Sequence, residues 1–186
     1  MKIGLTGGIG CGKSEALRIF GEKGWKTMST DAIAHQLITE DPVVGAELMK
    51  HFGTKEKKAI AAQVFSNAEK KSVLEEILHP RIREQWLGQI HKNPNENWVI
   101  EIPLLFEKRL ENYFDLVVCV ASSLEIQLER LHRRGIEEDD AKARIANQAP
   151  LSLKIQKSDR VLSNNGTIDF LEDQIELLLS NIRTTL

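Results

Sequence analysis

A glycine-rich stretch near the start of the chain, residues 7–14, contains residue types that bind phosphate. Its sequence, GGIGCGKS, fits the pattern G-x-x-x-x-G-K-[ST], with an apolar run before it and an amphipathic segment after it. Glycines let successive backbone N–H groups converge on a phosphate. Lys13 would reach the β- and γ-phosphates, and the Ser14 hydroxyl would bind magnesium. Residues 7–14, here called the phosphate loop, therefore predict a site for a nucleoside triphosphate with Mg²⁺. The predicted contacts are Gly8, Gly10, Cys11, Gly12, Lys13, Ser14 and Glu15.

Two of these residues raise questions of their own. Cys11 stands where the backbone N–H does the binding, so a small side chain suffices. A position at a helix N-terminus favours the thiolate, which makes Cys11 a candidate reactive thiol whose alkylation would block ATP. Glu15 falls in the first turn of the following helix, where a carboxylate suits the helix dipole. It also brings negative charge near the phosphates, and the sequence leaves open which effect is larger.

Two further features favour a kinase that acts on a small molecule. Asp31 follows a predicted strand, and the carboxyl ends of parallel strands line the ligand crevice. It could orient or deprotonate an attacking hydroxyl, help hold magnesium, or only cap the next helix. The run RLHRRGIEEDDAKAR (130–144) has two possible interpretations. Its arginines could stabilise the charge of a transferred phosphoryl group, with Gly135 as a hinge, or the run could be a solvated pair of charged helices. The N-K-x-D signature of Ras-type GTPases is missing from the sequence.

The bulk composition narrows the class of protein. The 186 residues are 41% hydrophobic and 28% charged, with a net charge of −2, so a folded domain without a general basic field is expected. We therefore expect no nucleic-acid partner and no membrane partner. Cys11 and Cys119 indicate reduced thiols rather than a disulfide framework. The start of the chain lacks the apolar core of a signal peptide, and a cytoplasmic location is expected.

The elements that must position these residues alternate between strand and helix. Such alternation predicts an α/β domain with a parallel sheet, and the stretch from 41 to 93 is mostly helical, with a kink or restart at Pro80. We expect an α/β nucleotide-binding core at residues 1–30 and 94–186, interrupted by a helical insertion at 31–93. Apolar runs predict strands at 2–6, 25–30, 98–102, 116–120 and 160–163, and helices after them at about 104–112, 123–134 and 137–148.

Together these segments resemble the dephospho-CoA kinase family over most of the chain. GLTGGIGCGKS matches the opening of the family, and STDAIAHQL matches its Asp-Ala-Asp segment at the second aspartate, Asp31. LHPRIR (78–83) and IPLLFE (102–107) match more specific segments. RIANQ (144–148) and SDRVLSNNG (158–166) match the lid and the last strand.

The resemblance implies a P-loop kinase fold of the nucleoside-monophosphate-kinase type, with a five-stranded parallel sheet flanked by helices. It further implies that the helical insertion at 31–93 is an acceptor-binding sub-domain and that a helical lid lies at about 132–150. It implies transfer of a phosphoryl group from ATP to the ribose 3′-hydroxyl of dephospho-CoA, the last step of coenzyme A synthesis. Asp31 would be the catalytic base, and Asn164 would lie near the adenine of ATP. Lys13 and the lid arginines Arg130, Arg134 and Arg144 would stabilise charge. The acceptor contacts would be His79, Pro80, Arg81, Pro103, Leu104, Leu105, Phe106 and Glu107.

Alternatives remain open for several of these residues. His79 and Pro80 could be a structural kink, and residues 104–106 could be plain strand-to-helix packing. The chain departs from the family pattern at Glu15, Ser29 and Ser163, where Thr, Asp and Asp are common. Other possible functions are a related kinase for another nucleotide or a sugar, and a nucleotide-binding switch without catalysis. The sequence does not indicate the oligomeric state.

Overall fold

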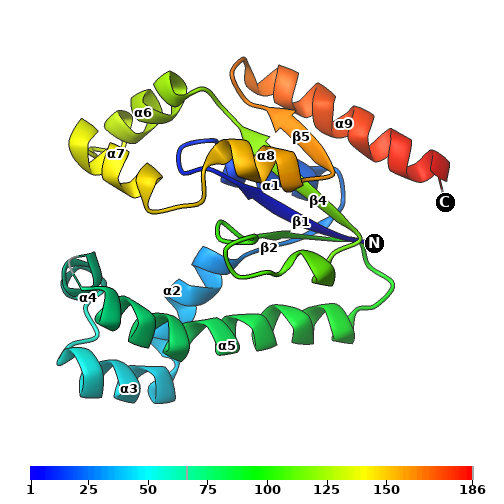
Figure 1. Ribbon diagram of the computed structural model, residues 1–186. Coiled ribbons are helices and arrows are strands. Elements are labelled where there is room, and N and C mark those ends of the chain that lie inside the picture. The colour runs from blue at the N-terminus through cyan, green and yellow to red at the C-terminus, as the bar shows by residue number, and fades with distance from the viewer. Residues whose placement is uncertain (66, 186) are drawn as a thin grey trace. The chain divides into compact units, whose positions relative to one another are not determined.

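The computed structural model describes residues 1–65 and 67–185 and divides into two compact units. The first unit comprises Met1–Ser29 and Asn95–Leu186, and the second comprises Thr30–Pro94. All the strands that the structure describes belong to the first unit, as the arrows in Figure 1 show. The phosphate loop and its surroundings can therefore be described within the first unit alone.

A single five-stranded sheet forms the centre of the first unit. Its order is β2-β3-β1-β4-β5, and every neighbouring pair is parallel. This arrangement confirms the fold class expected from the sequence. Because all strands run in one direction, their carboxyl ends meet at one edge of the sheet, where α/β proteins bind ligands. The strands are β1 (Lys2–Gly7), β2 (Lys26–Ser29), β3 (Trp98–Glu101), β4 (Leu116–Ala121) and β5 (Arg160–Ser163).

One face of the sheet packs on two helices, α1 (Lys13–Glu22) and α9 (Ile168–Thr185). Alternate strand residues point to this face, as the period of two in a β-strand requires. The helices contribute apolar residues three and four positions apart, so each buries one stripe. The fully buried members of this core include Ile3, Leu5, Val99, Val118, Val120, Ile19, Phe20, Leu171 and Ile175.

The opposite face is covered partly by the segment after β3. A Cβ atom on Gly4 would lie 2.8 Å from both Leu105 and Phe114, so this segment packs directly on the backbone of β1. The helix expected at 104–112 is wrong: the structure has turns at 103–109 and a short 3₁₀ helix, η1 (Glu111–Tyr113). Arg109 adopts a left-handed φ of 53°, and the Leu110 N–H bonds to Leu105 O, five residues back, which ends any helix there.

Three helices lie between β4 and β5 in the chain (Figure 1): α6 (Leu124–Arg133), α7 (Glu138–Ala146) and α8 (Leu151–Lys157). Gly135, between α6 and α7, has a φ of 74°. The expected helices at 123–134 and 137–148 correspond to α6 and α7, but the sequence analysis missed α8. This helix contacts β1 and β4, and it supplies a buried side chain to the candidate site.

Among its described residues, the second unit has helices and no strands. The helices are α2 (Thr30–Glu40), α3 (Pro42–Phe52), α4 (Lys57–Phe65) and α5 (Ala68–Lys92). Asp41 caps α3, because its Oδ1 accepts hydrogen bonds from the Val43 and Val44 N–H groups at 2.8 and 3.1 Å. Gly53 ends α3 in the left-handed conformation, with a φ of 69°. Among the described residues, no helix is both long and apolar enough to cross a membrane.

The sequence analysis expected a kink or a restart at Pro80. Helix α5 runs through Pro80 as one helix, so the restart is wrong. Proline has no N–H to donate to the preceding turn. The neighbouring Arg81 compensates partly, since its Nη1 donates to Ile77 O at 2.6 Å. Ile77 and Leu78 before the proline and Ile82 after it belong to one apolar cluster, which holds both halves of the helix in place.

Candidate active site

The phosphate loop follows β1, the central strand of the sheet, at its carboxyl end. Gly7 and Gly12 cannot be replaced by a larger residue without strain, because each has a positive φ and lies close to a neighbouring atom. A Cβ atom on Gly7, with a φ of 147°, would lie 2.2 Å from Val120 O. One on Gly12, with a φ of 88°, would lie 2.1 Å from Asn164 Nδ2. The loop therefore lies directly against β4 and the residue that follows β5.

Lys13 begins α1 and is nearly buried, with 8% of its surface exposed. Its Nζ donates to Gly8 O at 3.0 Å, so the side chain turns back across the loop. Gly12 precedes α1 and has no side chain to cap it, so the first-turn N–H groups lack a capping side chain. A helix N-terminus of this kind, next to a lysine ammonium, attracts an anion such as phosphate.

Three side chains hold the loop carbonyls from the side of β4, β5 and α6. We call Ser122, Arg130 and Asn164 the loop brace. Asn164 Nδ2 donates to Cys11 O at 2.9 Å, and Ser122 Oγ lies 3.4 Å from the same oxygen. Arg130 Nη1 donates to Gly10 O at 3.3 Å, and its Nη2 donates to Asn164 O at 2.9 Å. The structure thus places two predicted site residues, Arg130 and Asn164, against the loop, whereas the sequence analysis missed Ser122.

The Cys11 side chain is fully buried in the main core of the first unit. Burial raises the pKa of its thiol, and the backbone hydrogen bonds and the positive charges of Lys13 and Arg130 lower it less. A thiol that is buried and has a raised pKa is a poor nucleophile near neutral pH. The expectation that Cys11 is a reactive thiol is therefore wrong, because burial outweighs the helix N-terminus.

Glu15 lies in the first turn of α1 and pairs with Arg18 along the helix. Glu15 Oε1 accepts from Arg18 Nη2 at 2.6 Å and from its Nε at 3.1 Å. Arg18 also pairs with Glu22 one turn later. The Arg18 guanidinium thus offsets part of the negative charge that Glu15 brings near the loop.

Ser14 and Glu101 place two oxygen atoms together beside the loop. Ser14 Oγ lies 3.4 Å from Glu101 Oε1, and Glu101 is 4% exposed. Glu101 ends β3 and is paired in register with Leu5 of β1, which brings its carboxylate beside the start of α1. Hydroxyl and carboxylate oxygens are ligands that suit Mg²⁺, which keeps several waters and takes few protein ligands when it binds phosphates. In the described part of the chain, no group of three or more His, Cys, Asp or Glu residues could hold a metal.

The predicted acceptor segment, residues 103–107, follows β3 at the same edge. Leu105 and Phe106 are buried and Leu104 is half-buried in the turns that follow β3. Pro103 O accepts a hydrogen bond from Lys154 Nζ at 2.6 Å. The charged end of the segment, Glu107, is bound to the protein itself, as described next.

Glu107 Oε1 accepts from Lys154 Nζ and from the Ala149 N–H, each at 2.9 Å. Burial would raise the pKa of the Glu107 carboxyl. The hydrogen bonds from Lys154, Ala149 and its own backbone N–H act in the opposite direction and hold the pKa below its ordinary value. Glu107 is therefore a carboxylate near neutral pH.

Gln148 reaches the phosphate loop directly, and the sequence analysis assigned it no role. Its Oε1 accepts a hydrogen bond from the Ile9 N–H at 3.2 Å. Gln148 ends the RIANQ segment that carried the resemblance to a lid, so the motif already contained it. The contact places the residues after α7 next to the loop.

The other two predicted lid arginines, Arg134 and Arg144, make their described contacts within the lid segment. Arg134 is exposed at the end of α6. Arg144, on α7, forms a paired interaction with Asp140 one turn earlier, with Nε–Oδ1 and Nη2–Oδ2 distances of 3.0 and 2.9 Å. The structure therefore brings only Arg130 of the three arginines to the loop, as far as the described residues show.

Four predicted site residues belong to the second unit. Asp31 is exposed in the first turn of α2, which begins at Thr30, so Asp31 lies inside the helix rather than at its cap. On α5, His79 is half-buried, Pro80 is exposed, and Arg81 bonds to the backbone of its own helix. Helices α2 and α5 pack against each other, so these residues share one helical unit.

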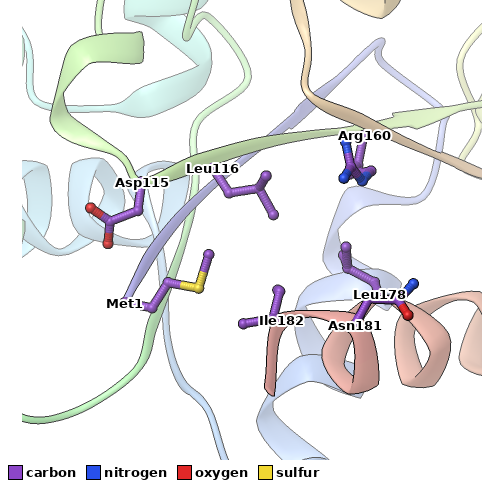
Figure 2. A pocket seen from close by; sticks show the side chains of 7 residues that line it. All are labelled: Met1, Asp115, Leu116, Arg160, Leu178, Asn181 and Ile182. Atoms are coloured by element: carbon purple, nitrogen blue, oxygen red, sulfur yellow. The ribbon is translucent and has the colours of Figure 1, made fainter. Parts of the chain in front are cut away.

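A cavity of about 480 Å³ lies at the other edge of the sheet. Figure 2 shows its lining, in which Leu116 and Arg160 are the first residues of β4 and β5, and Leu178 and Ile182 come from α9. Because parallel sheets bind ligands at the carboxyl ends of their strands, this cavity is separate from the nucleotide site.

The fold and the loop together define the class of protein. A five-stranded parallel sheet flanked by helices, with a phosphate loop between its central strand and the next helix, is the fold of a P-loop kinase. The sequence model of the dephospho-CoA kinase family matches residues 1–169. The chain belongs to the dephospho-CoA kinase family.

Individual relatives agree with this assignment. Dephospho-CoA kinase from Bacillus cereus is 36% identical over 191 residues, which cover 96% of each chain. Among solved structures, TT1252 from Thermus thermophilus superposes with a TM-score of 0.85 at 30% identity, over 97% of each chain. Dephospho-CoA kinase from Campylobacter jejuni superposes with a TM-score of 0.71 at 28% identity, over the full length of both chains.

Proposed function

We propose that this chain transfers the γ-phosphoryl group of ATP to the 3′-hydroxyl of the ribose of dephospho-CoA, giving coenzyme A and ADP. Membership of the dephospho-CoA kinase family supports ATP-dependent phosphorylation of dephospho-CoA as its reaction. The observation that carries the proposal is the braced phosphate loop, with Lys13 and the Ser14–Glu101 pair beside it. A site of this kind would position the triphosphate and stabilise its charge, which is what phosphoryl transfer requires.

On the donor side, the loop N–H groups and Lys13 would bind the β- and γ-phosphates. Ser14 and Glu101 would hold Mg²⁺, directly or through water. When bound, the ion neutralises charge on the phosphate oxygens. Asn164 and Arg130 would keep the loop in its binding conformation, and Asn164 would also border the adenine.

On the acceptor side, the second unit would bind dephospho-CoA. Asp31 is exposed and thus accessible to a hydroxyl group, which it would orient and deprotonate as the catalytic base. His79, Pro80 and Arg81 would contact the acceptor together with the segment from 103 to 107. Arg134 and Arg144 would stabilise the charge of the transferred group, and Arg144 would exchange Asp140 for a phosphate oxygen.

The setting proposed for this reaction is the cytoplasm. Both cysteines are free and buried, as expected of a protein that keeps its thiols reduced. Neither a nucleic acid nor a membrane is proposed as a partner.

The test is ADP release measured with ATP, Mg²⁺ and a panel of acceptors: dephospho-CoA, nucleosides, nucleotides and sugars. We expect release that depends on dephospho-CoA, with coenzyme A as the product by mass spectrometry. Preference for another nucleotide or a sugar would support a related kinase. Release independent of any acceptor, or no release, would contradict the kinase function and favour a nucleotide-binding switch.

The base is tested by Asp31→Asn, which keeps the shape of the side chain but cannot accept the proton. We expect kcat to fall by roughly 100-fold or more, while the dissociation constant for ATP stays the same. Asp41→Asn is the matched control, because Asp41 caps α3 in the same unit. Near-normal turnover of Asp31→Asn would reject the assignment of Asp31 as the base.

A further inference from the structure

Helix α8 buries one of its two lysines and exposes two of its three apolar residues. Lys154 is 0% exposed, whereas its neighbours Leu153 and Ile155 are 37% and 38% exposed. A lysine is almost never fully buried unless its charge is paired. If hydrophobic burial alone set the orientation of α8, Leu153 or Ile155 would be buried in place of Lys154. The interactions of the Lys154 ammonium must therefore explain this orientation.

The Lys154 ammonium joins α8 to the segment after β3. Its Nζ donates to Pro103 O at 2.6 Å and to Glu107 Oε1 at 2.9 Å. Thr6 Oγ1 lies 3.4 Å from the same Pro103 oxygen, and Thr6 directly precedes the phosphate loop. One buried charge therefore connects α8, the segment from 103 to 107 and the end of β1.

Through Glu107, the same charge reaches the residues that follow α7. We call residues 147–150 the lid exit. The carboxylate oxygen that accepts from Lys154 also accepts from the Ala149 N–H at 2.9 Å. Gln148, one residue earlier, accepts from Ile9 N–H in the phosphate loop at 3.2 Å. The lid exit is thus held at two successive residues, once to Glu107 and once to the loop.

Glu107 depends strongly on the lysine. Its second oxygen, Oε2, is buried without a hydrogen-bond partner. Removing Lys154 would leave this carboxylate without its cation, and a buried charge without a partner moves towards water or loses its charge. Either change alters the bond to Ala149 and with it the position of the lid exit.

We propose that Lys154 is a positioning residue for phosphoryl transfer, which together with Glu107 fixes the lid exit beside the phosphate loop. The inference rests on the proposed function, because the lid exit leads back to Arg144, the arginine assigned to the transferred group. The Lys154 ammonium bonds to Pro103 and Glu107, and it acts on the phosphate loop through Glu107, Ala149 and Gln148. Its effect is to place Gln148 against Ile9 and to limit where α7 can move.

The first test is Lys154→Met, which keeps the length of the side chain and removes its charge. We expect kcat to fall on the order of 100-fold, as small misplacements of a catalytic group do, with a much smaller change in the KM for ATP. Hydrogen exchange of the peptide covering the lid exit should become faster. The control is Lys26→Met, since Lys26 is exposed at the amino end of β2, and it should behave as wild type in both measurements.

A double variant separates positioning from simple stabilisation. Glu107→Leu combined with Lys154→Met removes both charges and fills the space with apolar groups, which often restores stability. We expect the thermal midpoint to recover relative to Lys154→Met, while kcat stays low and exchange at the lid exit stays fast. Recovery of kcat together with stability would overturn the proposal, because the pair would then serve folding alone.

A third variant serves if Lys154→Met does not fold. Gln148→Ala leaves the buried pair intact and removes only the contact with Ile9. We expect a lower kcat at unchanged stability, and wild-type turnover would overturn the proposal. Wild-type protein without acceptor-dependent ADP release would instead refute the proposed function, while the exchange measurements would still report on the lid exit.

Discussion

Replacement of Gly12 by alanine tests how tightly the loop brace is built. Gly12 has a φ of 88°, and a Cβ atom there would lie 2.1 Å from Asn164 Nδ2. That nitrogen donates to Cys11 O, so Asn164 cannot move away without breaking a buried hydrogen bond. The substitution therefore carries two costs, backbone strain and a displaced brace.

Both costs can be estimated from the structure. An alanine held at this left-handed φ loses about 1–2 kcal/mol. Loss of the buried hydrogen bond between Asn164 and Cys11 adds about 1–3 kcal/mol. Gly12→Ala should thus lower the free energy of unfolding by about 2–5 kcal/mol. Gly24 has the same φ of 88°, and a Cβ atom there would have nothing within 4 Å, so Gly24→Ala carries the strain alone.

Urea unfolding of the two variants and of wild type provides the assay, with ATP affinity measured by calorimetry. Gly12→Ala should lose more stability than Gly24→Ala and should also lose ATP binding. In an Asn164→Ala background the collision is absent, so the cost of Gly12→Ala should fall to that of Gly24→Ala. Equal losses for the two glycines in the wild-type background would refute the role of the brace.

Four further predictions concern single side chains. Glu101→Gln should raise the Mg²⁺ concentration for half-maximal activity on the order of 10-fold, because it weakens a ligand or water-mediated partner of the ion; an unchanged Mg²⁺ requirement would exclude Glu101 from the metal site. Arg144→Ala should slow turnover, whereas the control Asp140→Ala, which breaks the same exposed pair, should keep it, and equal rates for both would remove Arg144 from the mechanism. Because burial raises the pKa of the Cys11 thiol, iodoacetamide should label Cys11 slowly in the native protein at pH 7 and faster in urea, as mass spectrometry can follow; rapid native labelling would contradict this. Folding lowers the pKa of Glu107, so its carboxylate stabilises the protein at a pH above the ordinary carboxyl pKa of about 4.3. The difference in unfolding free energy between wild type and Glu107→Gln should therefore shrink as the pH falls towards and through the lower, folded pKa. A difference that stays the same between pH 7 and pH 3 would be inconsistent with the pairing.

Local sequence patterns predicted the sheet and the loop well. The apolar runs that form β3 and β4 are short and nearly continuous, as expected for strands covered on both faces. The glycines of the phosphate loop indicate the positions where the backbone needs angles that other residues rarely adopt. The prediction of a helix at 104–112 was wrong because the local sequence pattern did not indicate the backbone conformation. The composition of this segment suits a helix, but Arg109 takes a left-handed φ that no propensity signals.

Contacts between distant elements could not be predicted in the same way. Glu101 meets Ser14 because β3 is paired with β1 in one particular register, and an apolar run alone does not specify its register. The sequence analysis assigned no role to Lys154. Its burial depends on Glu107, 47 positions earlier, because an ion pair joins these two residues. Ser122 of the loop brace follows β4 and belongs to no recognised motif, so the sequence alone did not indicate its contact with the phosphate loop.

The loop brace has a consequence for how the protein is made. The hydrogen bond from Asn164 to Cys11 joins residues 153 positions apart, so the nucleotide site uses both the beginning and the end of the first unit. During synthesis the phosphate loop is made long before β5, so it lacks the Asn164 part of the loop brace until β5 has followed. Contacts of such long separation form late and slow the folding of a domain. A nascent chain would therefore gain the full support of its phosphate loop only once β5 has been made, and its affinity for ATP should rise at that step.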